Sequence, residues 1–249
     1  MGSEDEQRIG EELMEQMQTL GFCLITGVPG FDEDVLLDAI KRFHALPQDT
    51  KMQMALKHFN GRNKNIYHGY FPFLDSDPSH KEFYDMGRPI GDISDWEAKG
   101  CPLYEPNPWF EGSTEEQDAI LSTFEANFKI MHSVALKTLR SLSSSLGKSS
   151  NYFDPWFKDE CSSEFRAIHY KPREAGKGHT LSQDEHRLVT PPHTDSGFVT
   201  LLSTFMYKGL QVEIDGKYRS IQPVKNALVM NIGDTLERIS GHKIRATRH

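Results

Sequence analysis

The feature that most restricts the fold of this chain is a series of short apolar runs in its last third, each followed by a turn. The runs cover residues 165–170, 198–205, 210–214, 218–220, 227–231 and 243–248. Asp215-Gly216 separates two of them and is a strong signal for a tight hairpin turn, and Gly233-Asp234 is predicted to be a further turn. Many short strands at even spacing are typical of an antiparallel sandwich or barrel. A jelly roll with a ligand site between its two sheets satisfies this pattern.

The N-terminal part has helical periodicity instead. Residues 3–18 place apolar side chains on one face, and residues 22–26 form a short apolar run. Asp32 begins a second amphipathic segment, which Pro47 ends. The longest periodic segment covers residues 113–147, with Ser113 and Glu116 as a capping box. We expect this segment to be a scaffold helix about 45–50 Å long that lies along a sheet.

Residues 60–112 have no period and are rich in Asn, Gly, Pro and aromatic residues. Such a long irregular stretch in a compact domain usually carries function or covers a pocket. Its aromatic cluster consists of Tyr67, His68, Tyr70, Phe71 and Phe73. We favour packing under a loop over substrate contact for this cluster.

Composition excludes several classes of partner. The net charge of −8 argues against nucleic acid or an anionic membrane surface as the main partner. The three cysteines, Cys23, Cys101 and Cys161, are scattered and form no CxxC motif, which suits a reducing compartment and predicts a cytoplasmic protein. No apolar run reaches the length of a membrane span or of a signal peptide core.

The residues most able to carry chemistry lie in the stretch VTPPHTDSGFVT, residues 189–200. In an extended chain His193 and Asp195 project from the same face, because side chains alternate along a strand. Pro191 and Pro192 exclude a helix and keep the chain extended. A nitrogen and an oxygen donor at this spacing are part of a metal site, and the third donor must come from another strand.

The C-terminal stretch GHKIRATRH offers two candidates for this third donor, His242 and His249. Two histidines and one carboxylate on one face of a metal suit non-haem Fe(II) and O2 chemistry, because the open positions can hold a co-substrate and oxygen together. By itself, a His-x-Asp pair on a protein surface is common without a metal. We expect surface positions for His169, His179 and His186, and a solvated or packed role for His132.

Further short motifs occur in order through nearly the whole chain. They are LGFCLI at residues 20–25, FHALP at 43–47 with Lys51, Gly69-Tyr70, KEFYDMGR at 81–88, Leu146-Gly147 with Tyr152-Phe153, Arg166 with Tyr170, the His193/Asp195 pair, NIGD at 231–234 and SGHKIRATRH at 240–249. With this ordered set, the chain resembles the 2-oxoglutarate/Fe(II)-dependent dioxygenases. The branch it resembles contains isopenicillin N synthase and the plant flavonoid and gibberellin oxygenases.

The resemblance implies a fold that is mainly β with flanking helices, built on a double-stranded β-helix (jelly roll) core. It implies one domain over residues 1–249, in which residues 1–160 are a helical and irregular part packed on a core of residues 161–249. The family places its third metal ligand at the end of a run led by glycine, and here Gly241, Arg245 and Ala246 lead to His249 rather than His242. The implied Fe(II) ligands are therefore His193, Asp195 and His249, with no further catalytic residue.

The resemblance also implies 2-oxoglutarate as co-substrate. In the family its far carboxylate is held by an arginine of an R-x-S motif, about ten residues beyond the third ligand, and by the tyrosine of an R-x-N-x-Y pattern. Here Arg166-Ala-Ile-His-Tyr170 keeps Tyr170 but has Ile168 at the asparagine position. The arginine position falls beyond residue 249. We therefore expect a core cut short at its C-terminal end and a 249-residue chain that is a weak catalyst.

The predicted function is oxidation of a small molecule with O2 and 2-oxoglutarate, by hydroxylation, desaturation or ring closure. Two alternatives stay open. One is a family member that uses Fe(II) and O2 without 2-oxoglutarate, as isopenicillin N synthase does, and Ile168 leaves room for it. The other is a non-catalytic binding protein on the same scaffold. We expect a small-molecule partner, no nucleic acid and no membrane.

Overall fold

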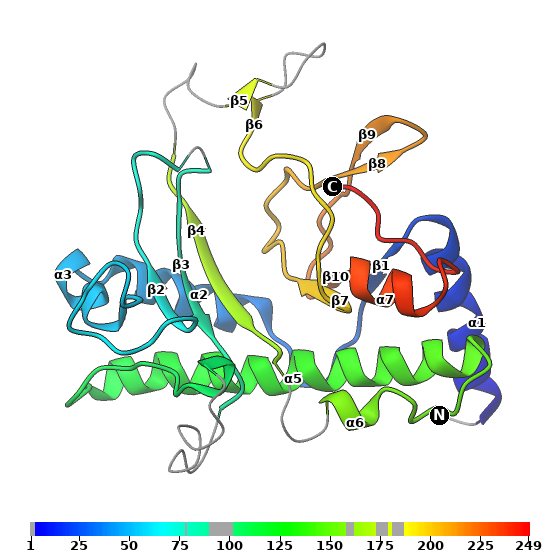
Figure 1. Cartoon of the computed structure of the whole chain (residues 1–249), viewed down its shortest axis with the longest axis horizontal. Coiled ribbons are helices and arrows are strands. Elements are labelled where there is room, and N and C mark those ends of the chain that lie inside the picture. Colours follow the sequence, from blue (N-terminus) through cyan, green and yellow to red (C-terminus); the bar gives the residue numbers. More distant parts are fainter. Residues whose placement is uncertain (1–2, 78, 90–101, 158–161, 173–178, 181–186) are drawn as a thin grey trace. The chain divides into compact units, whose positions relative to one another are not determined.

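The computed structural model describes residues 3–77, 79–89, 102–157, 162–172, 179–180 and 187–249 (Figure 1). Cys101, Cys161 and His186 lie outside the described residues. The chain divides into two compact units, each built from segments that are far apart in sequence. The first unit consists of Met1–Asp34, Lys129–Cys161 and Pro192–His249, and the second of Val35–Phe128 and Ser162–Pro191. The single domain over residues 1–249 stays a prediction.

The first unit is organised around a three-stranded antiparallel sheet. Its order is β1 (Phe22–Ile25), β10 (Leu228–Ile232) and β7 (Val199–Leu202), with β10 in the centre. All five residues of β10 are buried, as expected for a strand with a neighbour on each side and both faces covered. Helix α1 (Ser3–Thr19) precedes β1, which confirms the predicted helix over residues 3–18.

Gly21 ends α1 and adopts a positive φ of 67°. A Cβ at this position would lie 2.2 Å from the carbonyl oxygen of Arg245, so only glycine permits this approach of the C-terminal segment. Three hydrogen bonds secure the same contact. Arg245 N donates to Met17 O at 3.0 Å, the Arg245 guanidinium donates to Thr19 O at 2.9 Å, and Thr247 Oγ1 donates to Leu20 O at 2.6 Å.

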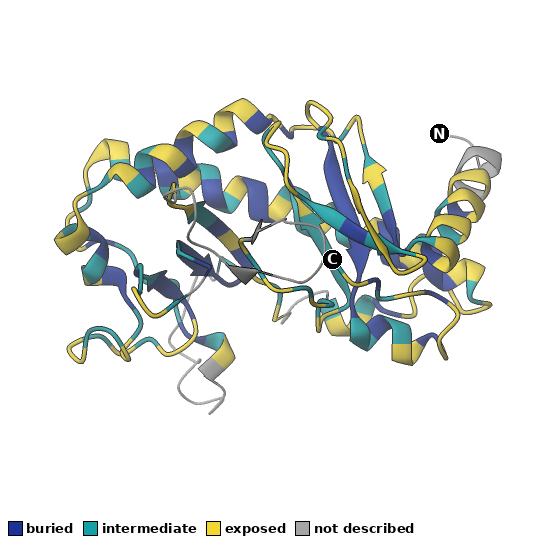
Figure 2. Cartoon of the chain, turned by 90° about the horizontal axis from the view of Figure 1, so that it is seen from above, coloured by how far each residue is buried: buried dark blue, intermediate teal, exposed yellow. Residues whose placement is uncertain are grey.

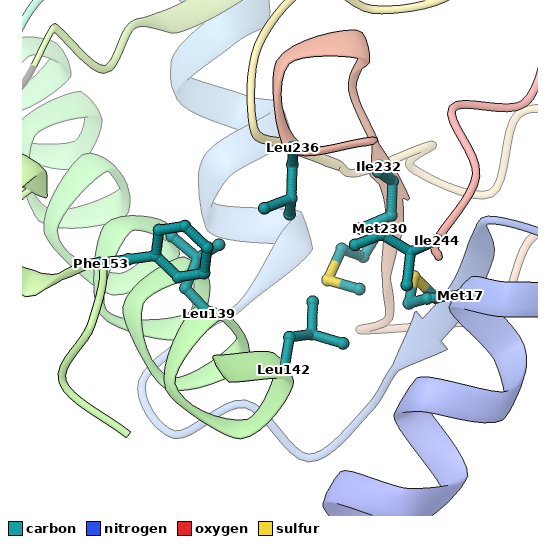
Figure 3. Close-up of a cluster of buried hydrophobic side chains, with 8 residues drawn as sticks. All are labelled: Met17, Leu139, Leu142, Phe153, Met230, Ile232, Leu236 and Ile244. Atoms are coloured by element: carbon teal, nitrogen blue, oxygen red, sulfur yellow. The ribbon is translucent and has the colours of Figure 1, made fainter. Parts of the chain in front are cut away.

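The hydrophobic core of the first unit joins α1, the last turns of α5 (Glu115–Ser145), β10 and α7 (Asp234–Ile239). Figure 3 shows eight buried side chains that point into one interior: Met17, Leu139, Leu142, Phe153, Met230, Ile232, Leu236 and Ile244. Burying a side chain of this size contributes about 1.5–3 kcal/mol relative to exposure. Phe153 reaches this core just before the short helix α6 (Asp154–Phe157).

The hairpin of β8 (Gln211–Ile214) and β9 (Lys217–Ser220) confirms the predicted turn. Asp215 and Gly216 both have positive φ, 52° and 72°, as the two central residues of the favoured hairpin turn require.

Two predictions for the C-terminal region were wrong. Residues 243–248 form no strand, because their backbone groups bond singly to separate partners, such as Met17 for Arg245 and Glu213 for Arg248. Residues 233–234 are not only a turn. Helix α7 begins at Asp234, after Gly233 in extended conformation.

The second unit has its own antiparallel sheet of β2 (Gly69–Phe71), β3 (Lys81–Met86) and β4 (Phe165–Tyr170), with β3 in the centre (Figure 1). Strand β4 confirms the predicted strand over residues 165–170. The other described elements here are α2 (Glu33–Ala45), α3 (Gln48–Lys51), η1 (Met52–Met54), η2 (Pro102–Tyr104), β5 (His179–Thr180) and β6 (Arg187–Leu188).

Aromatic rings form much of the core of the second unit. Phe43 of α2 contacts Tyr70, Tyr84, Trp109 and Phe124, with ring centroids 5.1–6.4 Å apart. Tyr70 is fully buried, which supports the packing interpretation for this member of the sequence cluster at residues 67–73. Phe71 likewise stacks on Phe83 across β2 and β3.

Helix α5 begins two residues later than predicted and has a different cap. Thr114 Oγ1 accepts from Gln117 N, and Gln117 Oε1 accepts from Thr114 N. The capping box is therefore Thr114/Gln117 rather than Ser113/Glu116, because both pairs satisfy the same sequence pattern one residue apart. In Figure 2 the long helices carry buried residues on one side and exposed residues on the other. None of the described helices is long and apolar enough to cross a membrane.

Candidate metal centre

The structure brings together the three side chains that the sequence singled out. His193, Asp195 and His249 each offer one ligand atom, and these atoms lie within 4.8 Å of one another. Asp195 Oδ1 is 3.7 Å from His193 Nε2 and 3.9 Å from His249 Nε2. The two imidazole rings have centroids 4.5 Å apart. We call these three residues the HDH cluster.

Backbone contacts set the position of the two histidines. His193 N donates to His249 O at 3.0 Å, and His249 N donates to His193 O at 2.9 Å. This reciprocal pair brings the two segments side by side, although neither histidine belongs to a described strand. The extended chain at His193 stays a prediction, and the regular strand of this segment starts at Val199.

The NIGD motif holds the loop that carries Asp195. Asp234 N donates to Asp195 O at 2.7 Å, and Thr235 N donates to Gly197 O at 3.1 Å. A Cβ on Gly233 would lie 2.3 Å from Gly197 O, so a side chain there would push the loop away. The sequence contained this motif, but its structural role depends on a contact with a segment 36 residues earlier.

A row of three cross-strand neighbours supports the HDH cluster. Asn231 of β10 is paired with Phe22 of β1 and with Thr200 of β7, so their side chains share one face of the sheet. Asn231 Nδ2 donates to Asp195 Oδ2 at 2.7 Å. The ring edge of Phe22 meets the ring of His249 at a centroid distance of 5.3 Å.

Hydrogen bonds orient the donor atoms of the cluster. His249 Nδ1 lies 3.1 Å from Thr247 O. Because a carbonyl only accepts, Nδ1 carries the proton and Nε2 keeps a lone pair on the Asp195 side, as is usual for a metal-binding histidine. With its Oδ2 bonded to Asn231, Asp195 presents Oδ1 to both histidines.

Asp195 is a carboxylate at neutral pH. Burial raises its pKa, but the hydrogen bonds from Asn231 and Thr200 and the nearby His249 and His193 outweigh burial and hold the pKa below its ordinary value. The side chain of His249 is 11% exposed and that of His193 is 46% exposed. The cluster is thus open to solvent on the His193 side, where small ligands can approach.

The structure places His242, the alternative third donor, on the surface. Its side chain is 71% exposed, and its Nδ1 lies 3.5 Å from a Glu237 oxygen. His132 is packed, with Nε2 3.0 Å from Phe157 O, so the packed alternative is correct.

A second cluster of metal-binding residue types lies in the second unit. It consists of His44, Glu82 and His169, whose ligand atoms also lie within 4.8 Å of one another. His169 was predicted as a surface residue, but it is only half-exposed and its Nδ1 lies 2.9 Å from Glu82 Oε1. The ammonium of Lys51 already neutralises Glu82 at 2.8 Å. The HDH cluster is therefore the better candidate for Fe(II).

Tyr170 ends β4 in the second unit, opposite Lys81 of β3, and is 43% exposed. Arg166 of the same sequence pattern makes a bidentate ion pair with Asp85, with two bonds of 2.7 Å. Ile168 is paired with Phe83. The role of Tyr170 in binding 2-oxoglutarate stays a prediction.

Two protein-family models match the chain. The model described as the 2OG-Fe(II) oxygenase superfamily matches residues 161–249. The model described as the N-terminal region of non-haem dioxygenases in morphine synthesis matches residues 1–112. The two matched ranges contain the first motif, LGFCLI at residues 20–25, and the last, SGHKIRATRH at 240–249.

Known proteins resemble the chain over nearly its whole length. A 2-oxoglutarate-Fe(II) type oxidoreductase of Emericella nidulans is 27% identical over 97% of this chain and 69% of its own length. Isopenicillin N synthase of Streptomyces clavuligerus is 24% identical over 98% of this chain and 74% of its own. A crystal structure from Caulobacter crescentus, assigned to the 2OG-Fe(II) oxygenase family, superposes with a TM-score of 0.77 at 27% identity, over 99% of this chain and 76% of that one.

These matches confirm the predicted fold class, mainly β with flanking helices on a jelly-roll core. They also confirm Fe(II) and 2-oxoglutarate as cofactor and co-substrate of an oxygenase, rather than either alternative. The chain is thus similar, over nearly its whole length, to 2-oxoglutarate/Fe(II)-dependent dioxygenases, in the branch that includes isopenicillin N synthase.

Proposed function

We propose that His193, Asp195 and His249 hold the Fe(II) ion, and that the chain uses it to oxidise a small organic molecule. The observation that carries this proposal is the convergence of two imidazole nitrogens and one carboxylate oxygen within 4.8 Å. Two nitrogens and one oxygen leave other positions of the metal open, and that donor set suits Fe(II) and O2. When bound, the iron supplies activation of O2 for the oxidation of a C–H bond, coupled to decarboxylation of 2-oxoglutarate.

Residues around the HDH cluster set the charge of Asp195, the tautomer of His249 and the orientation of the Asp195 carboxylate. Asp195 contributes one negative charge, because its pKa is held low. Thr247 O fixes the proton of His249 on Nδ1, and Asn231 keeps one carboxylate oxygen away from the metal position. Donors held in place in this way need little rearrangement on binding, and such supporting contacts typically strengthen metal affinity about 10–100-fold.

Tyr170 is our candidate for a hydroxyl that binds 2-oxoglutarate. Its support is its place in the Arg166-to-Tyr170 pattern and its partial exposure at the end of β4. A tyrosine hydroxyl can donate one hydrogen bond to a carboxylate. The net charge of −8 supports a small molecule, rather than nucleic acid or an anionic membrane, as the substrate class. The scattered cysteines support a reducing compartment such as the cytoplasm.

Metal stoichiometry tests this assignment. The chain, loaded anaerobically, should bind one Fe(II), or Mn(II) as a substitute, at the HDH cluster. Replacing His193 or Asp195 with Ala should lower the affinity at least tenfold and abolish succinate formation from 2-oxoglutarate. His242→Ala is the matched control, because this exposed histidine lies on the same C-terminal segment. Unchanged iron binding in both His193→Ala and Asp195→Ala, or loss in His242→Ala, would show that other residues hold the iron.

A further inference from the structure

The His44/Glu82/His169 cluster of the second unit is assembled from three elements. Glu82 of β3 and His169 of β4 are direct cross-strand partners, so their side chains share one face of the sheet. His44 comes from α2. The side chains of His44 and Glu82 are 4% and 2% exposed, while that of His169 is 42% exposed. The cluster is therefore buried on two sides and reaches solvent at the third.

The hydrogen bonds of His44 cannot all be satisfied by the neutral imidazole. Its Nε2 lies 3.2 Å from Ala167 O, so Nε2 must donate and Nδ1 must carry a lone pair. Nδ1 is buried, lies 3.3 Å from Glu82 Oε1 and has no hydrogen-bond partner. In the other neutral tautomer, Nδ1 could donate to Glu82, but the lone pair of Nε2 would face a carbonyl oxygen. Each neutral form leaves one unfavourable contact between two acceptors.

Either a second proton or a metal ion between the lone pairs would remove this conflict. A second proton would place a positive charge on an imidazole whose side chain is only 4% exposed, next to the Lys51 ammonium that already bonds Glu82. A metal ion would instead bind the lone pairs of His44 Nδ1 and Glu82 Oε1, which already face one another, and would replace the proton that His169 Nδ1 donates to Glu82. The bond from His44 Nε2 to Ala167 O is the contact that commonly orients a metal-binding histidine.

The spacing of the donors fits a small tetrahedral ion. Glu82 Oε1 is 3.3 Å from His44 Nδ1 and 2.9 Å from His169 Nδ1. Two ligands at 2.0–2.1 Å from a tetrahedral zinc ion are about 3.3 Å apart. Lys51 and Tyr70 both bond the other oxygen, Oε2, which leaves Oε1 on the histidine side.

We propose that His44, Glu82 and His169 form a second metal site, separate from the HDH cluster, that takes Zn(II). Imidazole nitrogen is a favoured ligand for zinc, and the partly exposed side at His169 leaves a fourth position for water. The Lys51 ammonium weakens the attraction of Glu82 for a cation, so the affinity is expected to be moderate. This site would link α2 to the β3–β4 sheet and does not depend on the proposed oxygenase site.

The test measures zinc binding in a chain whose HDH cluster has been disabled. In the double variant His193→Ala/Asp195→Ala, calorimetric titration with zinc chloride at pH 7.5 should show one site. Adding His169→Ala, a change at a partly exposed residue, should weaken zinc binding at least tenfold. His58→Ala is the matched control, because this exposed histidine belongs to the same unit and should leave zinc binding unchanged.

Two results would overturn the proposal. One is the absence of a zinc site in the folded double variant. The other is a zinc site that survives both His169→Ala and His44→Gln in folded protein. Circular dichroism and thermal unfolding of each variant separate loss of a ligand from loss of the fold. Zinc should also raise the melting temperature of the double variant but not that of its His169→Ala derivative.

Discussion

Asn231 Nδ2 donates a 2.7 Å hydrogen bond to Asp195 Oδ2, so the two carboxylate oxygens have different partners. One oxygen is bonded to the sheet, and the other faces His193 and His249. Asn231 itself is only 3% exposed and cannot easily turn away, because it lies in the central strand β10. The orientation of Asp195 is therefore a property of the sheet rather than of the loop that carries it.

Asn231→Ala should weaken Fe(II) or Mn(II) binding by about 10–100-fold, the usual cost of removing a group that orients a metal ligand. Asn231→Asp should weaken it further, because a second carboxylate would repel Asp195. Calorimetry of Mn(II) binding measures both effects. Met230→Ala is the matched control: it opens a cavity on the same strand, in the hydrophobic core shown in Figure 3, and should lower stability while leaving metal affinity intact. Equal metal affinities in Asn231→Ala and the parent chain would refute the orienting role.

Tyr170→Phe should weaken 2-oxoglutarate binding to the Mn(II)-loaded chain by a factor of about 2–10, because one hydrogen bond contributes about 0.5–1.5 kcal/mol. Metal affinity should not change. Tyr218→Phe on β9 is the control, since this exposed tyrosine bonds only weakly to Glu213, at 3.3 Å. Calorimetric titration with 2-oxoglutarate distinguishes the two variants. Identical affinities would leave Tyr170 with a structural role alone.

Phe43→Ala should lower the free energy of unfolding by about 3–5 kcal/mol, the usual cost of removing a buried aromatic ring. Phe43 is fully buried and contacts the rings of Tyr70, Tyr84, Trp109 and Phe124 among others, so the surrounding structure cannot easily close the cavity. Urea unfolding followed by fluorescence and circular dichroism gives the value. Tyr207→Ala, at a residue 61% exposed, should change stability by less than about 0.5 kcal/mol. A loss of less than 1 kcal/mol in Phe43→Ala would contradict the described packing.

Burial raises the pKa of the Cys23 thiol from its ordinary value of 9.0 to about 11. At pH 8 this change lowers the thiolate fraction about a hundredfold, so iodoacetamide should label Cys23 at least that much more slowly in the folded chain than in urea. Because the unfolded thiol loses its proton first, the contribution of Cys23 to stability should decline as pH rises from 9 toward 11. Mass spectrometry of the Cys23 peptide measures the rate. Similar rates in folded and unfolded protein would show that the thiol is accessible.

Local patterns were enough to predict the elements with a clear period. The alternation in residues 165–170 gave β4 with its observed bounds, and the helical period of residues 113–147 gave α5 within two residues at each end. Helix ends and turns, which are predicted from one or two residues, were located less reliably than whole elements. The cap of α5 was displaced by one position, and helix α7 was missed because Gly233-Asp234 also has the chemistry of a turn.

Contacts between distant segments could not be predicted from spacing. The apparent strand at residues 243–248 bonds to α1 and to β8, and only the folded chain brings these partners together. The same applies to the supporting residues Asn231 and Thr200, whose place beside Asp195 follows from strand register. His44 and His169 were missed as neighbours, because a helix and a cross-strand pair unite residues that are far apart in sequence.

The glycine at the end of α1 has a practical consequence for anyone who engineers this protein. Residues 17–21 bind the segment of Arg245 and Thr247 through hydrogen bonds and a close backbone contact at Gly21. This segment ends two residues before His249. The first helix is therefore part of the support for a candidate iron ligand at the opposite end of the sequence. Deleting residues 17–21, or replacing Gly21, would therefore displace His249 and alter the metal centre without changing any of its three ligands.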